Sequence, residues 1–237
     1  MQLRIARLGT VTRSRQYDDP CGIARALDVI GDRWALLVVR ELILGPKRFV
    51  QLRAGLRTVS QNVLSQRLRD LETAGVVRRD ILSPPASVAV YELTDRGRAL
   101  EPVLLELGRW GSQEPVTTTR ELTPDAFLVA LKTAFDPAAG VRPADREGDD
   151  GPPAAIYALD IGGDTCTVTV SDGALDITRG RPEHSDVSLA GDMATMRAVA
   201  FGREPITDAE QDGRLTVTGD RALADRFTRM FPVTSRS

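Results

Sequence analysis

The sequence predicts an α+β protein of two domains, and three observations indicate this. Residues 20–111 place apolar side chains at helical spacing, followed by two short β-like runs and another helix. Residues 124–237 instead alternate short β-like runs with helices and glycine turns. The charge divides in the same way, because residues 1–111 hold 18 basic and 12 acidic side chains and the remaining residues hold 13 and 21. A basic front and an acidic back favour domains with different partners.

The segments outside these domains predict an arm and a linker. Residues 1–19 are basic and irregular, which is typical of a flexible arm, and residues 112–123 are typical of a linker. No apolar run approaches the roughly 18 residues that span a bilayer, and no secretory signal is evident. The two cysteines are far apart and suit a reducing compartment. We therefore expect a cytoplasmic protein with no membrane partner.

The front domain predicts four helices, a hairpin and a closing helix. The first helix follows Pro20 and ends at Gly31, and Asp32 is the expected N-cap of the second. Helices are expected at 23–30, 34–44, 49–56 and 61–73, the hairpin strands at 76–82 and 88–93, and the closing helix at 95–110. Ser60 is the expected N-cap of the fourth helix, and Asp95 that of the last. This order of elements is that of a winged helix-turn-helix domain, with 83–87 as the wing loop.

The fourth helix predicts DNA recognition. It keeps a leucine stripe on one face and offers polar side chains on the other, as a helix in the major groove must. Glutamine and asparagine suit adenine edges, and arginine suits guanine or phosphate. The residues predicted to contact duplex DNA are Lys47, Arg48, Ser60, Gln61, Asn62, Ser65, Gln66, Arg67, Arg69, Arg78 and Arg79.

Six stretches of residues 20–111 resemble a known family, the HxlR-type regulators, which are related to the MarR group. They read PCGIARAL (20–27), GDRW (31–34), LILGPKRF (42–49), LSQRLRDLE (64–72), YELTDRG (91–97) and WG (110–111). The resemblance implies a sequence-specific transcriptional regulator. It also implies a homodimer on a pseudo-palindromic operator, held together by the first and last helices of the domain. Many such regulators end near the equivalent of Gly111, whereas this chain continues.

Cys21 leaves two interpretations open. It stands just before the first helix, where the helix N-terminus lowers a thiol pKa and makes the thiolate more reactive. Some members of the resembled family sense oxidants or electrophiles through a cysteine at this place. Cys21 could therefore be a redox sensor, or it could simply be a small side chain at a helix start. Cys166 falls in a predicted strand and is expected to be a packing residue.

The back domain predicts a sheet with helices layered on it. Strands are expected at 155–161, 165–170, 174–178, 187–189 and 215–218, with helices at 124–135, 192–201 and 220–231 and a loop at 136–153. The runs GGD (162–164), VSDG (170–173), DVSL (186–189), FG (201–202) and GRLTVTGD (213–220) resemble the sterol-carrier-protein type 2 fold. That resemblance implies a sterol-carrier-like domain with an apolar tunnel for a hydrophobic small molecule. The side chains that could line it are Met193, Met196, Phe201, Phe227, Met230 and Phe231, although all six could equally be ordinary core.

No motif of the chain predicts catalysis. His184 is the single histidine, and the sequence lacks a nucleophile elbow, a phosphate-binding glycine loop and a zinc-ligand spacing. We expect no enzyme, no cofactor and no metal. Two alternatives to a ligand-sensing regulator stay open. One is a carrier or accessory protein for lipids or hydrophobic metabolites whose winged helix mainly serves dimerisation. The other is a thiol-based sensor acting through Cys21.

Overall fold

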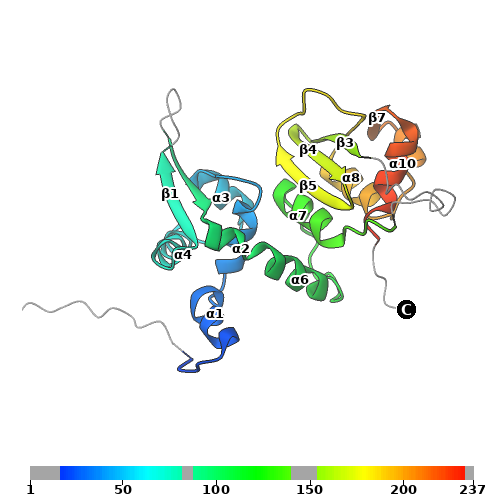
Figure 1. Cartoon of the computed structure of the whole chain (residues 1–237). Helices are drawn as coiled ribbons and strands as arrows, with labels where there is room; N and C mark the ends of the chain where they lie inside the picture. The colour runs from blue at the N-terminus through cyan, green and yellow to red at the C-terminus, as the bar shows by residue number, and fades with distance from the viewer. Residues whose placement is uncertain (1–16, 82–87, 140–153, 233–237) are drawn as a thin grey trace, which may run out of the picture.

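The front domain has the predicted order of helices and hairpin. The computed structural model describes residues 17–81, 88–139 and 154–232, so the arm up to residue 16 and the wing loop lie outside the described residues. The elements are α1 (Gly22–Ile30), α2 (Ala35–Leu42), α3 (Phe49–Gly55), α4 (Gln61–Thr73), β1 (Val77–Ile81), β2 (Ala89–Leu93), α5 (Asp95–Arg98) and α6 (Glu101–Gly111) (Figure 1). Strands β1 and β2 pair antiparallel, with Val77 opposite Leu93. Leucines 52, 64, 68 and 71 form the centre of this core.

Two helix caps differ from the prediction. Asp32 does not cap α2; Trp34 occupies the N-cap position, in the left-handed region at φ 81°, and the Asp32 carboxylate accepts from Arg67 of α4 instead. Thr94, rather than Asp95, caps α5, with its hydroxyl oxygen accepting from the Gly97 amide at 3.1 Å. Ser60 caps α4 as predicted. A cap is decided by which side chain reaches the free amides, and neighbouring polar residues compete for them.

The closing helix of the front domain is broken in two. The sequence predicts one helix over 95–110, but α5 ends at Arg98 and α6 begins at Glu101. Pro102 lies in the first turn of α6. Its nitrogen carries no hydrogen, so a continuous helix would lose the bond to the Arg98 carbonyl and its ring would clash there. Proline is tolerated in a first turn, and the chain therefore starts a new helix.

The back domain is a five-stranded sheet with helices packed on it. Its elements are α7 (Pro124–Ala134), β3 (Ala155–Ile161), β4 (Asp164–Ser171), β5 (Ala174–Arg179), β6 (Val187–Gly191), α8 (Met193–Ala200), α9 (Ile206–Gln211), β7 (Leu215–Gly219) and α10 (Arg221–Arg229). The strand order is β5-β4-β3-β6-β7, with β3 and β6 parallel and the other neighbours antiparallel. Six-residue α9 was not predicted, because it is too short to show a helical period. The expected loop 136–153 is described only as far as residue 139.

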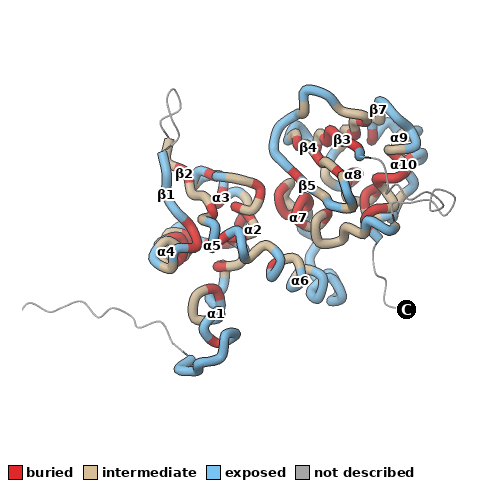
Figure 2. The backbone as a smooth tube through the Cα atoms, viewed as in Figure 1, coloured by how far each residue is buried: buried red, intermediate tan, exposed pale blue. Residues whose placement is uncertain are grey.

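Each domain has a core of its own, and the two cores meet. Figure 2 shows buried segments gathered in two groups, one in each domain. Along β3, Tyr157 and Leu159 are buried on the face that the helices cover. Leu44, in the turn between α2 and α3, belongs to the core of the back domain, and Ile43 packs against both cores. The front domain therefore contributes to the core of the back domain.

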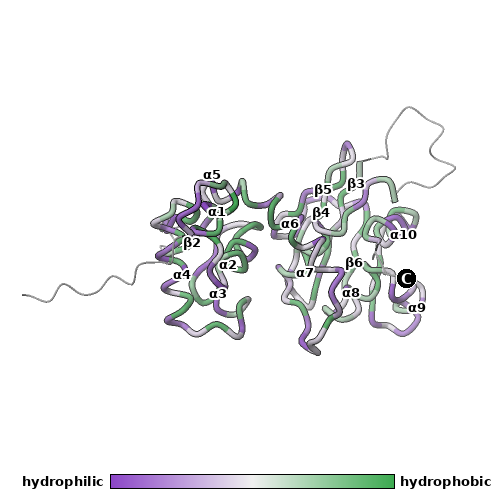
Figure 3. The backbone as a smooth tube through the Cα atoms, turned by 90° about the horizontal axis from the view of Figure 1, so that it is seen from below, coloured by the Kyte–Doolittle hydropathy of each residue, from purple (hydrophilic) through white to green (hydrophobic). Residues whose placement is uncertain are grey.

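Helix α7 is the part of the back domain that lies against the front domain. It packs against α2 and α6 on one side and against β5 and α8 on the other. Figure 3, which views the molecule from below, shows α6 extending from the front domain towards the back domain. No helix among the described residues is both long and apolar enough to cross a membrane.

Candidate nucleic-acid interface

One face of α4 is polar and exposed. Leu64, Leu68 and Leu71 are buried at helical spacing, which fixes the rotation of the helix about its axis. The remaining positions are thereby turned outward. Among the predicted contact residues, those exposed on α4 and at its cap are Ser60, Gln61, Asn62, Gln66 and Arg69, and Ser65 is half-buried.

Hydrogen bonds within α4 order part of this face. The Gln66 side-chain amide donates to Asp70 at 2.7 Å, and Arg69 donates to the Gln66 carbonyl oxygen at 2.7 Å. These bonds link side chains one turn apart, so Gln66 and Arg69 are held along the same side of the helix. They are exposed bonds, which DNA groups can replace.

Arg67 is placed differently from Arg69. Its guanidinium pairs with Asp32, before α2, and with Asp70 at 3.2 Å, and its side chain is only 18% exposed. Arg67 therefore joins α4 to the turn between α1 and α2. This position makes it a packing residue of the helix-turn-helix as well as a candidate contact.

Arginines also flank α4 on neighbouring elements. Arg48 is exposed at the N-cap of α3, and Arg78 and Arg79 are exposed on β1. Arg78 donates from Nε to Glu92 on β2 at 2.7 Å, and this hydrogen bond raises the Arg78 pKa. The hairpin therefore presents two permanent cations beside the recognition helix.

Lys47 is a correction to the predicted contact set. Its side chain is buried, at 4% exposure for the residue, and its ammonium donates to Glu41 at 2.5 Å and to Asp125 of α7. A buried ammonium paired with two carboxylates is not available to a DNA phosphate. The pairing with Asp125 could not be predicted from the sequence, because Asp125 lies 78 residues further along the chain.

The six residues predicted to line an apolar tunnel lie together in the back domain. Met196, Phe227, Met230 and Phe231 are buried in its core, and Met193 and Phe201 pack against that core. Sequence reasoning missed Tyr157 on β3, whose ring lies 5.2 Å from that of Phe227. Within the described part of the chain its hydroxyl is buried and has no hydrogen-bond partner. Burial raises the pKa of Tyr157 to about 12.

The two cysteines lie in opposite environments. Cys21 is exposed at the N-terminus of α1, where the nearby backbone amides of Ile23 and Ala24 lower its thiol pKa. Cys166 is buried on β4, and desolvation raises its pKa to about 12. A thiolate is therefore favoured at Cys21 and disfavoured at Cys166.

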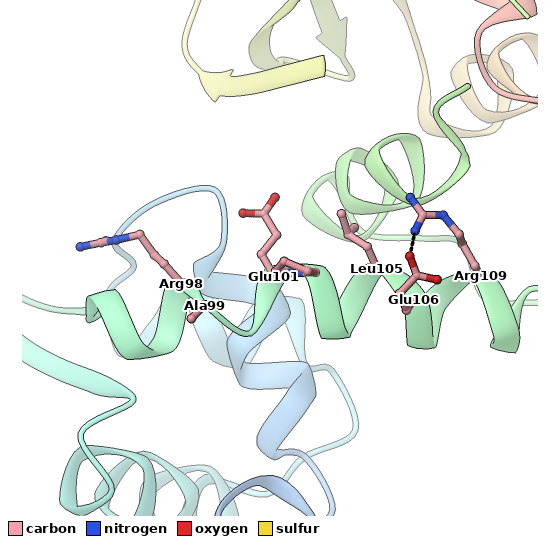
Figure 4. Close-up of a pocket in the computed structure, with 7 residues that line it drawn as sticks. Arg98, Ala99, Glu101, Leu105, Glu106 and Arg109 are labelled. Carbon is pink, nitrogen blue, oxygen red and sulfur yellow. Dashed lines mark hydrogen bonds and ion pairs between the residues drawn. The ribbon is translucent and has the colours of Figure 1, made fainter. Parts of the chain in front are cut away.

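An open groove of about 510 Å³ runs along α5 and α6. Arg98, Glu101, Glu106 and Arg109 supply its charged wall, and Figure 4 shows the ion pair between Glu106 and Arg109. None of the six residues predicted to line the apolar tunnel lines this groove. No group of three or more histidine, cysteine, aspartate or glutamate side chains in the described ranges could hold a metal ion.

The arrangement of α2 to α4 with the β1–β2 hairpin defines a winged helix-turn-helix protein, a class that binds duplex DNA. Residues 29–118 match the HxlR-like helix-turn-helix family. The uncharacterised transcriptional regulator YvaP of Bacillus subtilis is 40% identical over 89 residues, which are 38% of this chain and 82% of YvaP. This chain therefore belongs to the HxlR-like family of DNA-binding transcriptional regulators, as its sequence motifs predicted.

Two further regulators are similar to part of this chain. The transcriptional regulator YodB of Bacillus subtilis is 36% identical over 98 residues, or 40% of this chain and 88% of YodB. The solved structure of the redox regulator HypR in its oxidised form is 35% identical, covers 41% of this chain and all of that chain, and has a TM-score of 0.37.

The back domain matches a different family. Residues 155–236 match the alkyl sulfatase C-terminal family rather than a sterol-carrier family. The structure contains the predicted sheet with helices, and its family match is to a C-terminal domain named for alkyl sulfatases.

Proposed function

We propose that the protein binds a pseudo-palindromic operator as a homodimer, with α4 of each copy in the major groove. The observation that carries this proposal is the exposed row of Asn62, Gln66 and Arg69 opposite the buried leucines of α4, with Gln61 exposed in the first turn. Amide side chains suit adenine edges, and arginine suits guanine. Ser60 and Ser65 lie beside them, while Arg48, Arg78 and Arg79 would contact phosphates from either side.

Exposed apolar side chains on α1 and α6 support the dimer. Ile23 is 72% exposed and Trp110 is 65% exposed, and both lie on helices of the front domain. The other large exposed apolar side chains of these two helices are Leu27, Val103 and Leu107. Apolar groups gathered on two helices are typical of a surface that a second copy covers.

A selection experiment tests this proposal. The full chain is used to select duplexes from a random library, and the selected duplex is footprinted. We expect two inverted half-sites whose centres are separated by about 10 base pairs, one helical turn, or a multiple of it. A single asymmetric site protected by a monomer would contradict the paired arrangement.

We further propose that the back domain is a sterol-carrier-like module that binds a hydrophobic small molecule and changes DNA affinity. The clustering of Met193, Met196, Phe201, Phe227, Met230 and Phe231 supports an apolar ligand, and the match to a domain of alkyl sulfatases supports an alkyl chain. The buried Tyr157 hydroxyl could bind a polar head group. Native mass spectrometry of freshly purified protein is expected to show a bound mass of a few hundred daltons, as ligand pockets of ordinary size hold. Protein that stays ligand-free after incubation with long-chain alkyl sulfates and fatty acids would count against the module.

Redox sensing through Cys21 is a second candidate function. The exposed thiol with its lowered pKa favours it. Diamide treatment should change the DNA affinity of the wild-type protein and leave that of Cys21→Ser unchanged. Equal responses of the two proteins would exclude this function.

A further inference from the structure

The chain has two lysines, Lys47 and Lys132, and both form ion pairs across the domain boundary. Lys47 of the front domain pairs with Asp125 of α7. Lys132 of α7 pairs with Glu101 of α6. Nearby, Arg109 of α6 donates from Nε to the carbonyl of Thr133 on α7 at 3.1 Å. Helix α7 is therefore fixed to the front domain by polar contacts at two separate places.

The Lys47 pair is the more deeply buried of the two. Glu41 on α2 is fully buried, Asp125 is 7% exposed and Lys47 is 4% exposed. Each carboxylate has a second cation: Arg40 donates to Glu41 at 2.7 Å, and Arg179 of β5 donates to Asp125. The charges thus alternate from α2 through Lys47 to α7 and the sheet. We call Glu41, Lys47 and Asp125 the buried bridge.

The backbone of Lys47 is also hydrogen-bonded to β2 of the β1–β2 hairpin, which we call the wing. Its amide donates to the Tyr91 carbonyl at 2.9 Å, and the Tyr91 amide donates to the Lys47 carbonyl at 2.8 Å. The next residue, Arg48, is the N-cap of α3. One residue therefore connects the wing, α2, the start of α3 and the back domain.

We propose that the back domain positions the helix-turn-helix and the wing for DNA through the buried bridge, with Lys47 as a positioning residue. Separating one side chain from a buried ion pair leaves an uncompensated buried charge. We therefore expect the three side chains of the buried bridge to stay paired or to separate together. Any event that shifts α7 would move Lys47, and with it the start of α3 and the strand of the wing. The inference rests on the DNA binding of the family and holds whether or not the back domain binds a small molecule.

Asp125→Asn is the first test, because Asp125 lies on α7, outside the winged helix-turn-helix. The full chain is titrated with a duplex selected from a random library by the wild-type protein. We expect DNA affinity to fall about tenfold, a typical coupling between distant sites. The matched control is Lys132→Met, which removes the other interdomain ion pair away from α3 and the wing. It should bind within about twofold of wild type.

Lys47→Met separates positioning from direct contact. The apolar substitute keeps the length of the side chain, and affinity should again fall about tenfold. A positioning role leaves the dependence of log affinity on log salt unchanged, whereas a lost phosphate contact lowers that slope by about 1. A slope lowered in this way would overturn the assignment.

Lysine acetylation gives a readout that does not depend on DNA. Acetic anhydride should modify Lys47 slowly in the wild-type protein and faster in Asp125→Asn, as peptide mass spectrometry would show. Leu44→Ala, which weakens the apolar contact between the domains without changing charge, replaces Asp125→Asn if the latter does not fold. It should expose Lys47 and weaken DNA binding in the same way.

The outcomes separate this inference from the DNA-binding function itself. A variant with Lys47 exposed but wild-type DNA affinity would overturn the inference, and so would rapid acetylation of Lys47 in the wild-type protein. Failure of the wild-type protein to select any duplex would instead refute the assigned DNA binding. Parallel losses in Asp125→Asn and Lys47→Met, with Lys132→Met unaffected, would establish the bridge.

Discussion

At the scale of single side chains, α4 separates two arginines that look alike in the sequence. Arg69 is exposed beside Gln66, whereas Arg67 is tied to Asp32 and Asp70. The helical period predicts that both avoid the leucine stripe. It cannot predict the Asp32 contact, because that depends on how the turn before α2 folds against α4. Lys47 shows the same limit, since its buried partner Asp125 comes from a distant segment.

The two alanine substitutions should therefore differ in effect, with Arg69→Ala changing DNA affinity and Arg67→Ala changing stability. Arg69→Ala is expected to lower affinity for the selected duplex about tenfold, within the roughly 1–3 kcal/mol of a specific contact. Arg67→Ala is expected to lower the free energy of unfolding by up to about 1 kcal/mol, as for a partly exposed ion pair. DNA titration and thermal unfolding of both variants measure this. A loss of affinity in Arg67→Ala as large as that in Arg69→Ala, without a stability change, would show that Arg67 contacts DNA.

The two cysteines should be alkylated in different pH ranges, because their pKa values are shifted in opposite directions. The backbone amides at the start of α1 favour the Cys21 thiolate, so its folded-state pKa is lowered and its alkylation rate should rise with pH through a midpoint below the usual thiol value. Cys166, with its pKa raised to about 12, should stay unreactive near neutral pH in the folded protein. Iodoacetamide labelling followed by peptide mass spectrometry measures both rates, and urea-unfolded protein is the control. Equal rates in the folded state would contradict the placement of Cys166.

At the scale of elements, Gly55 of α3 shows that packing against the buried bridge leaves no room for a larger side chain on this helix. A Cβ at this position would lie 2.1 Å from a carboxylate oxygen of Glu41, which Lys47 and Arg40 hold in place. Gly→Ala inside a helix normally stabilises by roughly 0.5–1 kcal/mol. Gly55→Ala should instead destabilise by about 1–3 kcal/mol, as overpacking does.

Gly111 at the end of α6 is the matched control. Nothing lies within 4 Å of a Cβ built there, so Gly111→Ala should leave the free energy of unfolding equal or slightly raised. Urea unfolding of both variants is the measurement. A stabilised Gly55→Ala protein would mean that Glu41 is free to move, and the close packing around the bridge would be wrong.

The elements themselves were largely predictable, and their exceptions have physical causes. The leucine stripe of α4 and the Ser60 cap are local signals, and the structure confirms both. The break between α5 and α6 follows from Pro102, whose effect a helical period alone does not show. The strands of the back domain are separated by glycine turns, which made them recognisable. Their order in the sheet depends on long-range pairing and was not predicted.

At the scale of the whole molecule, we expect a dimer held by α1 and α6. Ile23→Asp places a charge on the exposed apolar face of α1 and should convert the dimer into a monomer, because an unpaired charge is costly to bury in an interface. Val116→Asp is the control, since Val116 is 75% exposed in the segment after α6. Light scattering coupled to size exclusion measures the masses. A wild-type monomer, or a dimer that survives Ile23→Asp, would place the interface elsewhere.

The arrangement of the two domains could not be read from the sequence. Residues 112–123 predict a linker, and a linker alone is compatible with two independent domains. Leu44 and Lys47, both predicted only as front-domain residues, instead join the back domain through its core and through Asp125. Through these contacts the back domain packs against the helix-turn-helix and stabilises it.

Sequence-specific DNA binding by α4 is tested most directly by a fluorescence titration of the full chain with its selected duplex and with a scrambled duplex across a salt series. We predict at least about 10³-fold tighter binding to the selected duplex. Affinity should fall steeply as salt rises, because several phosphates are contacted. Equal affinity for the two duplexes, or binding that salt does not weaken, would contradict sequence-specific recognition by α4.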